Sequence, residues 1–554
     1  MRVMTTTINA TAWTSARPSP AAVHHRIPLA ALALALGFAA GCGDTKPECP
    51  NCDTLVVAAT GEPGVLVPPL IQDAVGRDIT DLVYERLAVL RRGASPVDTA
   101  GYQPGLATTW QRLDSLTWRF RLRPGAKWQD GQPVLPSDVV FSFEAYTDTT
   151  LGAPAGEALE GVTVSADGAD GVQIKFPRSY SEQLYDATAQ VRILPRHVWD
   201  PKLRSAWGAD SGVGALIGSG PYRIASWIRG QSLTAAAIDS TGAGFKRVIW
   251  RFARDPDGAL DLVLSGEADL METVTSPAAR ARVATNPKVK TVSYPSAVQG
   301  FLGFRHADAG GPHPILGDRA VRLALAWSVD RENLIHAVIG PDAVAPPGPV
   351  SRAIWIYNDS LKAPGFDPDR ARRLLDSAGW KAGSDGIRSK AGRRLTLGIL
   401  VPSTSTARKQ LAEGIQQMWK AVGVAAEITA VDFSVFQERL RQGKFDTMIG
   451  AWLDDPSPRN LANQWATRGI GVQNFGRYSS PVFDSLFAAA QSARNAEDAR
   501  RGWNEALEAL TGDAAAIFLY TPTNLAVLGS GLSGVTIDPF SWLHDVRDWR
   551  KNGQ

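Results

Sequence analysis

Two adjacent carboxylates, Asp454 and Asp455, follow an apolar segment that ends near the aromatic Trp452. A buried carboxylate that faces an ammonium group forms a charge-assisted hydrogen bond, which a neutral partner does not supply. An aromatic side chain beside it offers apolar contact that tolerates varied groups. The alternative is that both carboxylates belong to a solvated turn after a strand. Residues 450–456 are therefore the first candidate for a binding site.

Signals for catalysis are absent from the sequence. It has no HExxH zinc motif, no GxSxG nucleophile elbow and no GxxxxGK[ST] phosphate loop. His306 and His313 lie seven residues apart around Gly-Gly-Pro, but no third metal ligand accompanies them. We therefore expect no enzyme activity, no catalytic residues, no metal and no cofactor. A secreted hydrolase stays a less favoured alternative, because sequence alone does not exclude a carboxylate pair that acts as acid and base.

All three cysteines, Cys42, Cys49 and Cys52, lie within eleven residues of one another. A metal site would need a second cysteine pair, and a redox motif would need a strand followed by a helix. An oxidising compartment permits a small local disulfide. We expect either a Cys49–Cys52 disulfide or free thiols.

The N-terminal segment has the pattern of an export signal. Arg2, Arg17 and Arg26 are its only charged residues, and an apolar run begins at residue 27 and is too short to cross a bilayer. We predict a signal peptide over residues 1–41 and a flexible spacer over 42–53. Residues 39–42, Ala-Ala-Gly-Cys, resemble a bacterial lipobox, which implies a lipid on Cys42, although Ala39 stands where leucine is usual. Plain secretion is the alternative.

Charge and length limit the remaining possibilities. Without residues 1–41 the chain has 513 residues, with 55 basic and 55 acidic side chains. This balance argues against a nucleic-acid-binding protein, which needs a basic face. A chain of this length exceeds one hydrophobic core, so we expect two or more lobes. No apolar run after Cys42 approaches membrane-spanning length.

The elements around the first candidate site are those of an α/β fold. Asp367 and Pro368 predict the start of a helix, and Gly379 predicts its end. Strand-like residues 395–401 and 424–431 flank a helical pattern over 406–422, which predicts a parallel pair joined by a right-handed crossover. A short helix over 435–441 and a strand over 445–453 then lead to Asp454.

Residues 118–146, WRFRLRPGAKWQDGQPVLPSDVVFSFEAY, resemble the signature of the family 5 extracellular solute-binding proteins, the peptide and nickel receptors of ABC importers. Other segments resemble elements of the same family in the same order, across about residues 54–540. They are residues 104–107, 193–197, 218–222, 265–269, 318–324, 328–331, 374–380 and 443–446.

This resemblance implies a two-lobed α/β periplasmic-binding-protein fold of type II, in the large cluster C class, with a two-strand hinge. By analogy, lobe I comprises residues 54–298 and 522–554, and lobe II comprises residues 299–521. Such a protein closes around its ligand by hinge motion. The implied function is a monomeric periplasmic receptor, held at the membrane by its lipid, that delivers a peptide or other small solute to an inner-membrane ABC permease. An exported sensor with the same fold is the alternative, because fold does not name the ligand.

The resemblance also implies individual ligand contacts. In peptide-binding members an aspartate three residues after the tryptophan pairs with the ligand's α-ammonium, and Asp455 has that spacing from Trp452. Asp454 is the alternative, because the segment is one residue shorter here. Trp452 would form part of the cleft wall, with Asn474 and Phe475 beside it. Four arginines could receive a ligand carboxylate, and their spacing does not choose between them: Arg305, Arg439, Arg441 and Arg459.

Overall fold

The computed structural model describes residues 52–551, except 203, 209–211, 240–243 and 309. The predicted signal peptide, the predicted lipidation site Cys42 and the first cysteine of the predicted disulfide, Cys49, lie outside these residues. Cys52 is disulfide-bonded. Its pairing with Cys49 stays a prediction. No helix of the described residues is long and apolar enough to cross a membrane.

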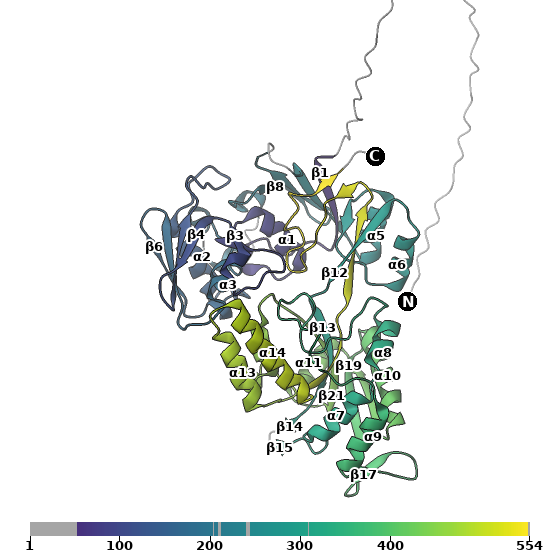
Figure 1. Ribbon diagram of the computed structural model, residues 1–554. Coiled ribbons are helices and arrows are strands. Elements are labelled where there is room, and N and C mark those ends of the chain that lie inside the picture. Colours follow the sequence, from purple (N-terminus) through teal and green to yellow (C-terminus); the bar gives the residue numbers. More distant parts are fainter. Residues whose placement is uncertain (1–51, 203, 209–211, 240–243, 309, 552–554) are drawn as a thin grey trace, which may run out of the picture. The chain divides into compact units, whose positions relative to one another are not determined.

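A seven-stranded mixed sheet forms the first core (Figure 1). Its central strand begins at residue 54 and pairs in parallel with its neighbour on either side. Across the sheet the strands are β12 (Val289–Pro295), β23 (Thr523–Gly529), β11 (Leu270–Met271), β1 (Thr54–Thr60), β10 (Arg247–Ala253), β9 (Ser232–Ala237) and β8 (Tyr222–Ile228).

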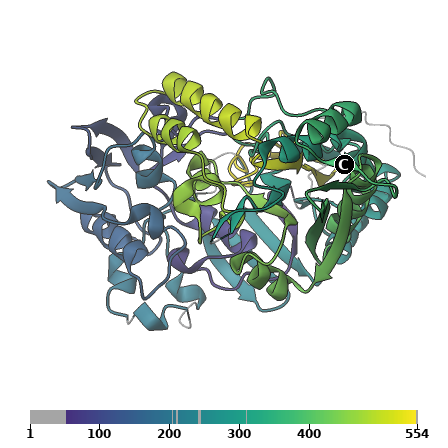
Figure 2. The same cartoon turned by 90° about the horizontal axis from the view of Figure 1, so that it is seen from below.

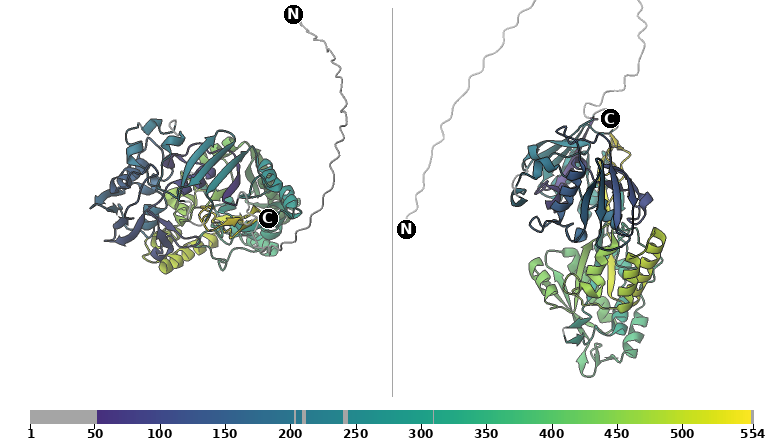
Figure 3. Two further views of the ribbon diagram at one scale, coloured as in Figure 1. Left: turned by 90° about the horizontal axis from the view of Figure 1, so that it is seen from above. Right: turned by 90° about the vertical axis from the view of Figure 1, so that its left-hand side faces the viewer.

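A separate antiparallel sheet contains the segment that resembles the family signature. Its strands, in order, are β4 (Ala107–Arg112), β5 (Thr117–Leu122), β7 (Gly171–Lys175) and β6 (Thr163–Asp167). Phe120 and Leu122 point into its core while Arg121 lies between them, as expected for a half-exposed strand. Helix α2 (Pro136–Thr147) packs on this sheet, which faces the viewer in the right-hand panel of Figure 3.

A five-stranded sheet forms the third core. Its strands, in order, are β20 (Ala425–Val431), β19 (Thr396–Pro402), β21 (Thr447–Leu453), β13 (Val298–Phe304) and β22 (Ala516–Tyr520). β13 is buried along almost its whole length, because helices and loops cover both faces of the sheet. Gly300 is required in this strand, since a Cβ there would lie 2.2 Å from the Tyr520 ring.

The local predictions for residues 367–453 are confirmed. Helix α9 spans Pro368–Ser377, and the Asp367 side chain accepts a hydrogen bond from the Arg370 amide at 2.7 Å. Helix α10 (Thr406–Ala421) joins β19 to β20, and the two strands are parallel. Helix α11 (Phe433–Arg441) then precedes β21, which ends at Leu453, directly before Asp454.

The remaining helices surround these sheets. Helices α13 and α14 lie side by side (Figure 2). The bounds of the helices not yet given are α1 (Ala74–Val83), α3 (Gln183–Thr188), α4 (Arg196–Trp199), α5 (Pro256–Ser265), α6 (Pro277–Ala284), α7 (Arg319–Trp327), α8 (Arg331–Val338), α12 (Leu461–Trp465), α13 (Pro481–Gln491) and α14 (Ala496–Gly512).

Two short connections join the seven-stranded and the five-stranded sheets. The chain leaves β12 at Pro295 and enters β13 at Val298, and it leaves β22 at Tyr520 and enters β23 at Thr523. Figure 1 shows β12 and β13 in succession along this path. The predicted lobe boundary at 521/522 falls in the second connection, and the boundary at 298/299 lies one residue inside β13. The division into lobes at these residues stays a prediction.

Candidate functional site

A cavity of about 500 Å³ contains both carboxylates of the first candidate site. Its wall combines segments attached to the seven-stranded sheet with segments attached to the five-stranded sheet. The lining residues fall within 68–94, 146–155, 185–192, 353–355, 454–456 and 538–544. A cavity of this size is typical of small-molecule sites.

Asp454 lies where the chain leaves β21 and is held by the backbone of two other segments. Its amide donates to the Ala297 carbonyl at 2.8 Å, and its Oδ2 accepts from the Ser351 amide at 2.9 Å. Burial raises the pKa of Asp454 to about 7, and the Ser351 amide opposes this rise. Asp454 is therefore close to half protonated at neutral pH.

Asp455 points toward helix α3. Its Oδ1 accepts hydrogen bonds from the Tyr185 hydroxyl and from the Ser457 amide, both at 3.0 Å. Tyr185 comes from a segment 270 residues away in sequence, and it also lines the cavity. The contact therefore joins the end of β21 to a helix that packs beside the four-stranded sheet.

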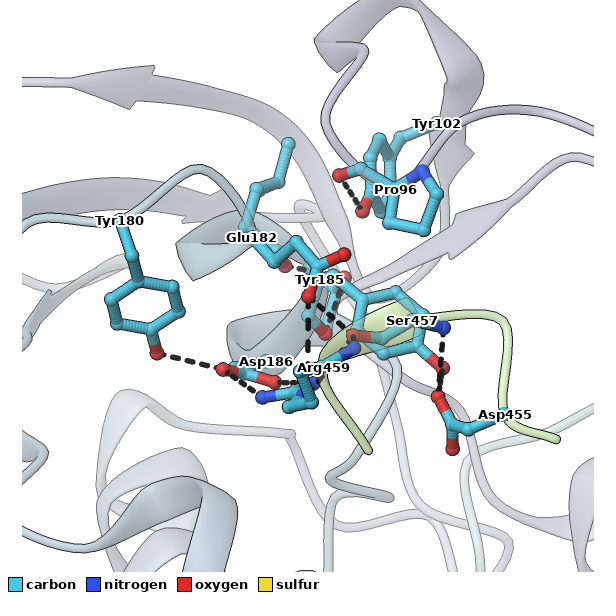
Figure 4. A network of polar contacts seen from close by, with 11 residues as sticks. Pro96, Tyr102, Tyr180, Glu182, Tyr185, Asp186, Asp455, Ser457 and Arg459 are labelled. Atoms are coloured by element: carbon cyan, nitrogen blue, oxygen red, sulfur yellow. Dashed lines mark hydrogen bonds and ion pairs between the residues drawn. The ribbon is translucent and has the colours of Figure 1, made fainter. Parts of the chain in front are cut away.

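An ion pair strengthens the same connection (Figure 4). Arg459 donates through both terminal nitrogens to Asp186, with Nη1 to Oδ2 at 2.6 Å and Nη2 to Oδ1. The Tyr180 hydroxyl also donates to Asp186 at 2.7 Å. The Asp186 side chain is fully buried. Its burial raises its pKa, and the Arg459 guanidinium opposes this rise.

Glu182 is a further carboxylate of this cluster. It accepts a hydrogen bond from the Ser457 hydroxyl and lies 3.9 Å from the Arg459 guanidinium. Burial raises its pKa to about 7, although Arg459 lowers it. We call Glu182, Asp186, Asp454, Asp455 and Arg459 the acidic cluster. It contains four carboxyl groups and one guanidinium.

Two arginines, one after α1 and one after α3, share one carboxylate. Arg86 Nη2 donates to Asp81 Oδ1 at 2.8 Å, and Arg192 Nε donates to the same oxygen at 2.7 Å. Both arginines line the cavity. Sequence reasoning missed them, because Asp81 and Arg192 are 111 residues apart and no local pattern links them.

The other predicted contacts lie outside the lining of this cavity. The Trp452 ring stacks between Phe301 and Phe475, with centroid distances of 6.0 and 6.2 Å. The Asn474 amide donates to the carbonyls of Ala466 and Tyr478 and thereby ties its own loop together. The predicted ligand contacts of Trp452, Asn474 and Phe475 stay predictions, as do those of Asp454 and Asp455.

The four arginines left open by the sequence also lie outside the lining. Arg459 pairs with Asp186, Arg305 pairs with Asp308 at 2.6 Å, and Arg441 pairs with Glu438 at 3.1 Å. Arg439 borders a different groove, beside α11.

The two histidines have structural contacts. His306 Nε2 lies 2.9 Å from the Ala515 carbonyl, and burial lowers the pKa of His306 to about 3. His313 Nε2 lies 3.1 Å from Asp446. Within the part of the chain that the structure describes, no group of three or more potential metal ligands occurs.

Comparison with known proteins identifies the family. Residues 101–471 match the family model described as bacterial extracellular solute-binding proteins, family 5 Middle. The chain belongs to this family. The resemblance found in the sequence is therefore confirmed, and the chain is an extracytoplasmic binding protein and not an enzyme.

Three characterised proteins match this chain over about nine-tenths of its length. An oligopeptide-binding protein, AppA, from Bacillus subtilis is 22% identical over 89% of this chain and 91% of its own length. The dipeptide-binding protein of Escherichia coli is 23% identical over 89% of this chain and 93% of its own length. Heme-binding protein A of Haemophilus influenzae is 22% identical over 90% of this chain and 92% of its own length.

Solved structures confirm the two-lobe α/β fold. The structure of Bacillus subtilis AppA in complex with a nonapeptide covers 90% of this chain and 98% of its own, with 22% identity and a TM-score of 0.68. HbpA2 from Haemophilus parasuis covers 88% of this chain and 98% of its own, with 22% identity and a TM-score of 0.76.

Proposed function

We propose that this chain is the receptor of an ABC importer, which binds a peptide or a similar small solute with an amino group in the cavity at Asp455. Its delivery partner is an inner-membrane permease. Relatives named for oligopeptide and dipeptide binding support a peptide as the solute. Because another relative is named for heme binding, the solute class follows from the chemistry of the site.

The observation that carries the proposal is the charge of the acidic cluster. The cluster holds four carboxyl groups and one guanidinium. Asp186 and Glu182 lie within 4 Å of the Arg459 guanidinium, and Asp454 and Asp455 line the cavity. Buried negative charge without a cationic partner is unfavourable. A cation that enters the cavity is therefore attracted to the carboxylates of the acidic cluster. A ligand ammonium can accordingly replace water at Asp455 and form a charge-assisted hydrogen bond.

The proposed mechanism is closure of two lobes, residues 54–298 with 522–554 and residues 299–521. The two connections near residues 295–298 and 520–523 support a hinge at those points. The contacts from Asp455, Ser457 and Arg459 to residues 182–186 hold the lobes together around the cavity. No covalent chemistry takes place, and the permease's ATPase supplies the energy for uptake.

We further propose that residues 1–41 direct export, that Cys42 carries a lipid and that residues 42–53 tether a monomeric receptor in the periplasm, with a Cys49–Cys52 disulfide in the tether. Anchoring raises the local concentration of the receptor at the permease. Trp452, Asn474 and Phe475 are kept as proposed contacts of the solute.

The test is to purify the exported protein, release its ligand by denaturation and identify the ligand by mass spectrometry. Calorimetric titration with alanine peptides of two to five residues then measures affinity, with N-acetylated peptides as the matched control. We expect the free ammonium to be required and the peptide to be recovered unchanged. Hydrolysis of the peptide, or equal affinity for the acetylated form, would contradict the proposal.

A further inference from the structure

We propose that the ion pair between Arg280 and Asp342 is a brace across the hinge, which stabilises the lobe arrangement of this structure from the side opposite the cavity. Arg280 lies in α6, and Asp342 lies in the loop after α8. Neither residue belongs to the lining of the cavity. The inference rests on the proposed closure of the two lobes and goes beyond it, because it names a remote pair that sets how readily the solute is bound.

The brace joins the cores of two different sheets. Helix α6 packs on the seven-stranded sheet, because Ala279 and Val283 share a buried cluster with residues of β1 and β23. The loop after α8 packs on the five-stranded sheet, because Ala343 is buried in a cluster with residues of β13 and β19. Arg280 Nη1 donates to Asp342 Oδ2 at 3.1 Å. The ion pair therefore links one core directly to the other.

Both residues of the brace also contact the second connection between these sheets. Thr523, the first residue of β23, accepts a hydrogen bond on its carbonyl from Arg280 Nη2 at 3.0 Å. The Thr523 hydroxyl donates to the Asp342 carbonyl at 2.6 Å. Before the connection, Thr521 and Val344 exchange two backbone hydrogen bonds, at 2.8 and 3.1 Å. The loop after α8 is thus bonded to the chain on both sides of the point where the proposed hinge bends.

The brace and the cavity lie on opposite sides of the hinge strands. Figure 1 shows α6 and α8 on one side of β12 and β13, and α3 and α13 on the other. The contacts from Arg459 to Asp186 and from the Ser181 amide to the Gln491 carbonyl are made on the side of α3 and α13. Contacts on both sides of a hinge hold it more firmly than contacts on one side, because a rotation about the hinge displaces at least one of the two sets.

The exposure of the brace sets the size of its effect. The Arg280 side chain is 25% exposed and the Asp342 side chain is 57% exposed. Ion pairs exposed to this degree change an equilibrium constant by less than about fivefold. Because the receptor retains its solute in the arrangement that encloses the cavity, the apparent affinity falls in proportion to the population of that arrangement. Loss of the brace therefore weakens binding although the cavity itself is unchanged.

The test compares the exported wild type with Arg280→Gln and Asp342→Asn, first by small-angle X-ray scattering without peptide and then by calorimetric titration with alanine peptides of two to five residues. We expect a larger radius of gyration in both variants and an affinity that is lower by about two- to fivefold. The double variant should show about the same loss as either single variant, because the pair is already broken in each. Arg282→Gln is the matched control, since Arg282 lies on the same helix and pairs with Asp261 of α5, which packs on the same sheet.

The outcomes separate the brace from the proposed function. An unchanged radius of gyration, or an unchanged affinity for a peptide that the wild type binds, would overturn the inference. Losses that add up in the double variant, or an equal effect of Arg282→Gln, would also overturn it, because the effect would then not arise from the ion pair. If the wild type binds no peptide, the proposed peptide class of solute fails, and scattering without peptide still tests the brace. Asp342→Asn provides the same comparison if Arg280→Gln does not fold.

Discussion

Arg459 and Asp186 form a two-point ion pair between segments that are 273 residues apart. Arg459 follows β21 of the five-stranded sheet, and Asp186 lies in α3 beside the four-stranded sheet. The Ser181 amide also donates to the Gln491 carbonyl at the end of α13, at 2.9 Å. These contacts therefore tie segments on the two sides of the cavity to each other.

Loss of Arg459 should destabilise the protein strongly. Arg459→Gln leaves the fully buried Asp186 carboxylate without its guanidinium, and we expect the free energy of unfolding to fall by about 3–5 kcal/mol. Urea denaturation measures it. Adding Asp186→Asn to Arg459→Gln should recover part of the loss, because the buried charge is then removed. A change below about 1 kcal/mol in the single variant would show that the pair is solvated in solution.

The two adjacent aspartates should differ in their effect on binding. Asp455→Asn should weaken the binding of a peptide with a free N-terminus by at least about tenfold, because the ligand ammonium loses its charged partner. Asp454→Asn should have a smaller effect near pH 7, since Asp454 is already close to half protonated there. Calorimetric titration of both variants with the same peptide measures the two losses of affinity. A larger loss in Asp454→Asn would transfer the proposed role to Asp454.

Stability should depend on pH through Glu182. Burial raises its pKa to about 7 from an ordinary value of 4.5, so between these values the folded state holds a proton that the unfolded chain has lost. The folded state is therefore favoured at low pH, and this contribution is lost as the pH rises from 4.5 to 7, by about 3 kcal/mol in total.

The neutral variant Glu182→Gln isolates this effect. As the pH rises from 4.5 to 7, the free energy of unfolding of the wild type should fall relative to that of the variant. Above pH 7 the difference between the two should stay constant. Denaturant titrations at half-unit pH steps measure the two curves. Parallel curves would mean that Glu182 is ionised in the folded protein.

The stack of Phe301, Trp452 and Phe475 should contribute to the stability of the core around β21. Phe301→Ala should cost about 3–5 kcal/mol, because its side chain is almost fully buried. Trp452 is only half-buried, so its replacement by alanine should cost less. If Trp452→Ala also weakens peptide binding, while Phe301→Leu does not, the predicted solute contact of Trp452 is supported.

The proposed anchor has a direct test in fractionated cells. Cys42→Ser should move the protein from the membrane fraction to the soluble envelope fraction, because a serine at this position cannot take a thioether-linked lipid. Export itself should continue, since residues 1–41 are unchanged. Mass spectrometry of the mature N-terminus measures the cleavage after residue 41 and the lipid on residue 42. An unchanged membrane fraction in the variant would contradict lipidation at Cys42.

Many helices and strands of this protein could be predicted from the sequence, because local interactions decide where they begin and end. A capping aspartate, a first-turn proline and a terminating glycine are decided within a few residues, so α9, α10, β19, β20 and β21 lie close to their predicted ranges. The ordered family segments likewise pointed to the fold and the general function. Even Asp454 and Asp455 could be selected, because they directly follow a predicted strand.

The partners of the carboxylates at and near the cavity could not be selected in the same way. Tyr185 reaches Asp455 over 270 residues, and Arg192 reaches Asp81 over 111. Whether a charge is solvated, paired or left with a free donor depends on which distant segment packs against it, because burial and Coulomb energy arise only once the chain has folded. For that reason the residues alone identified an extracytoplasmic binding protein, and only the packed structure brought Tyr185 to Asp455 and Arg192 to Asp81 at its cavity.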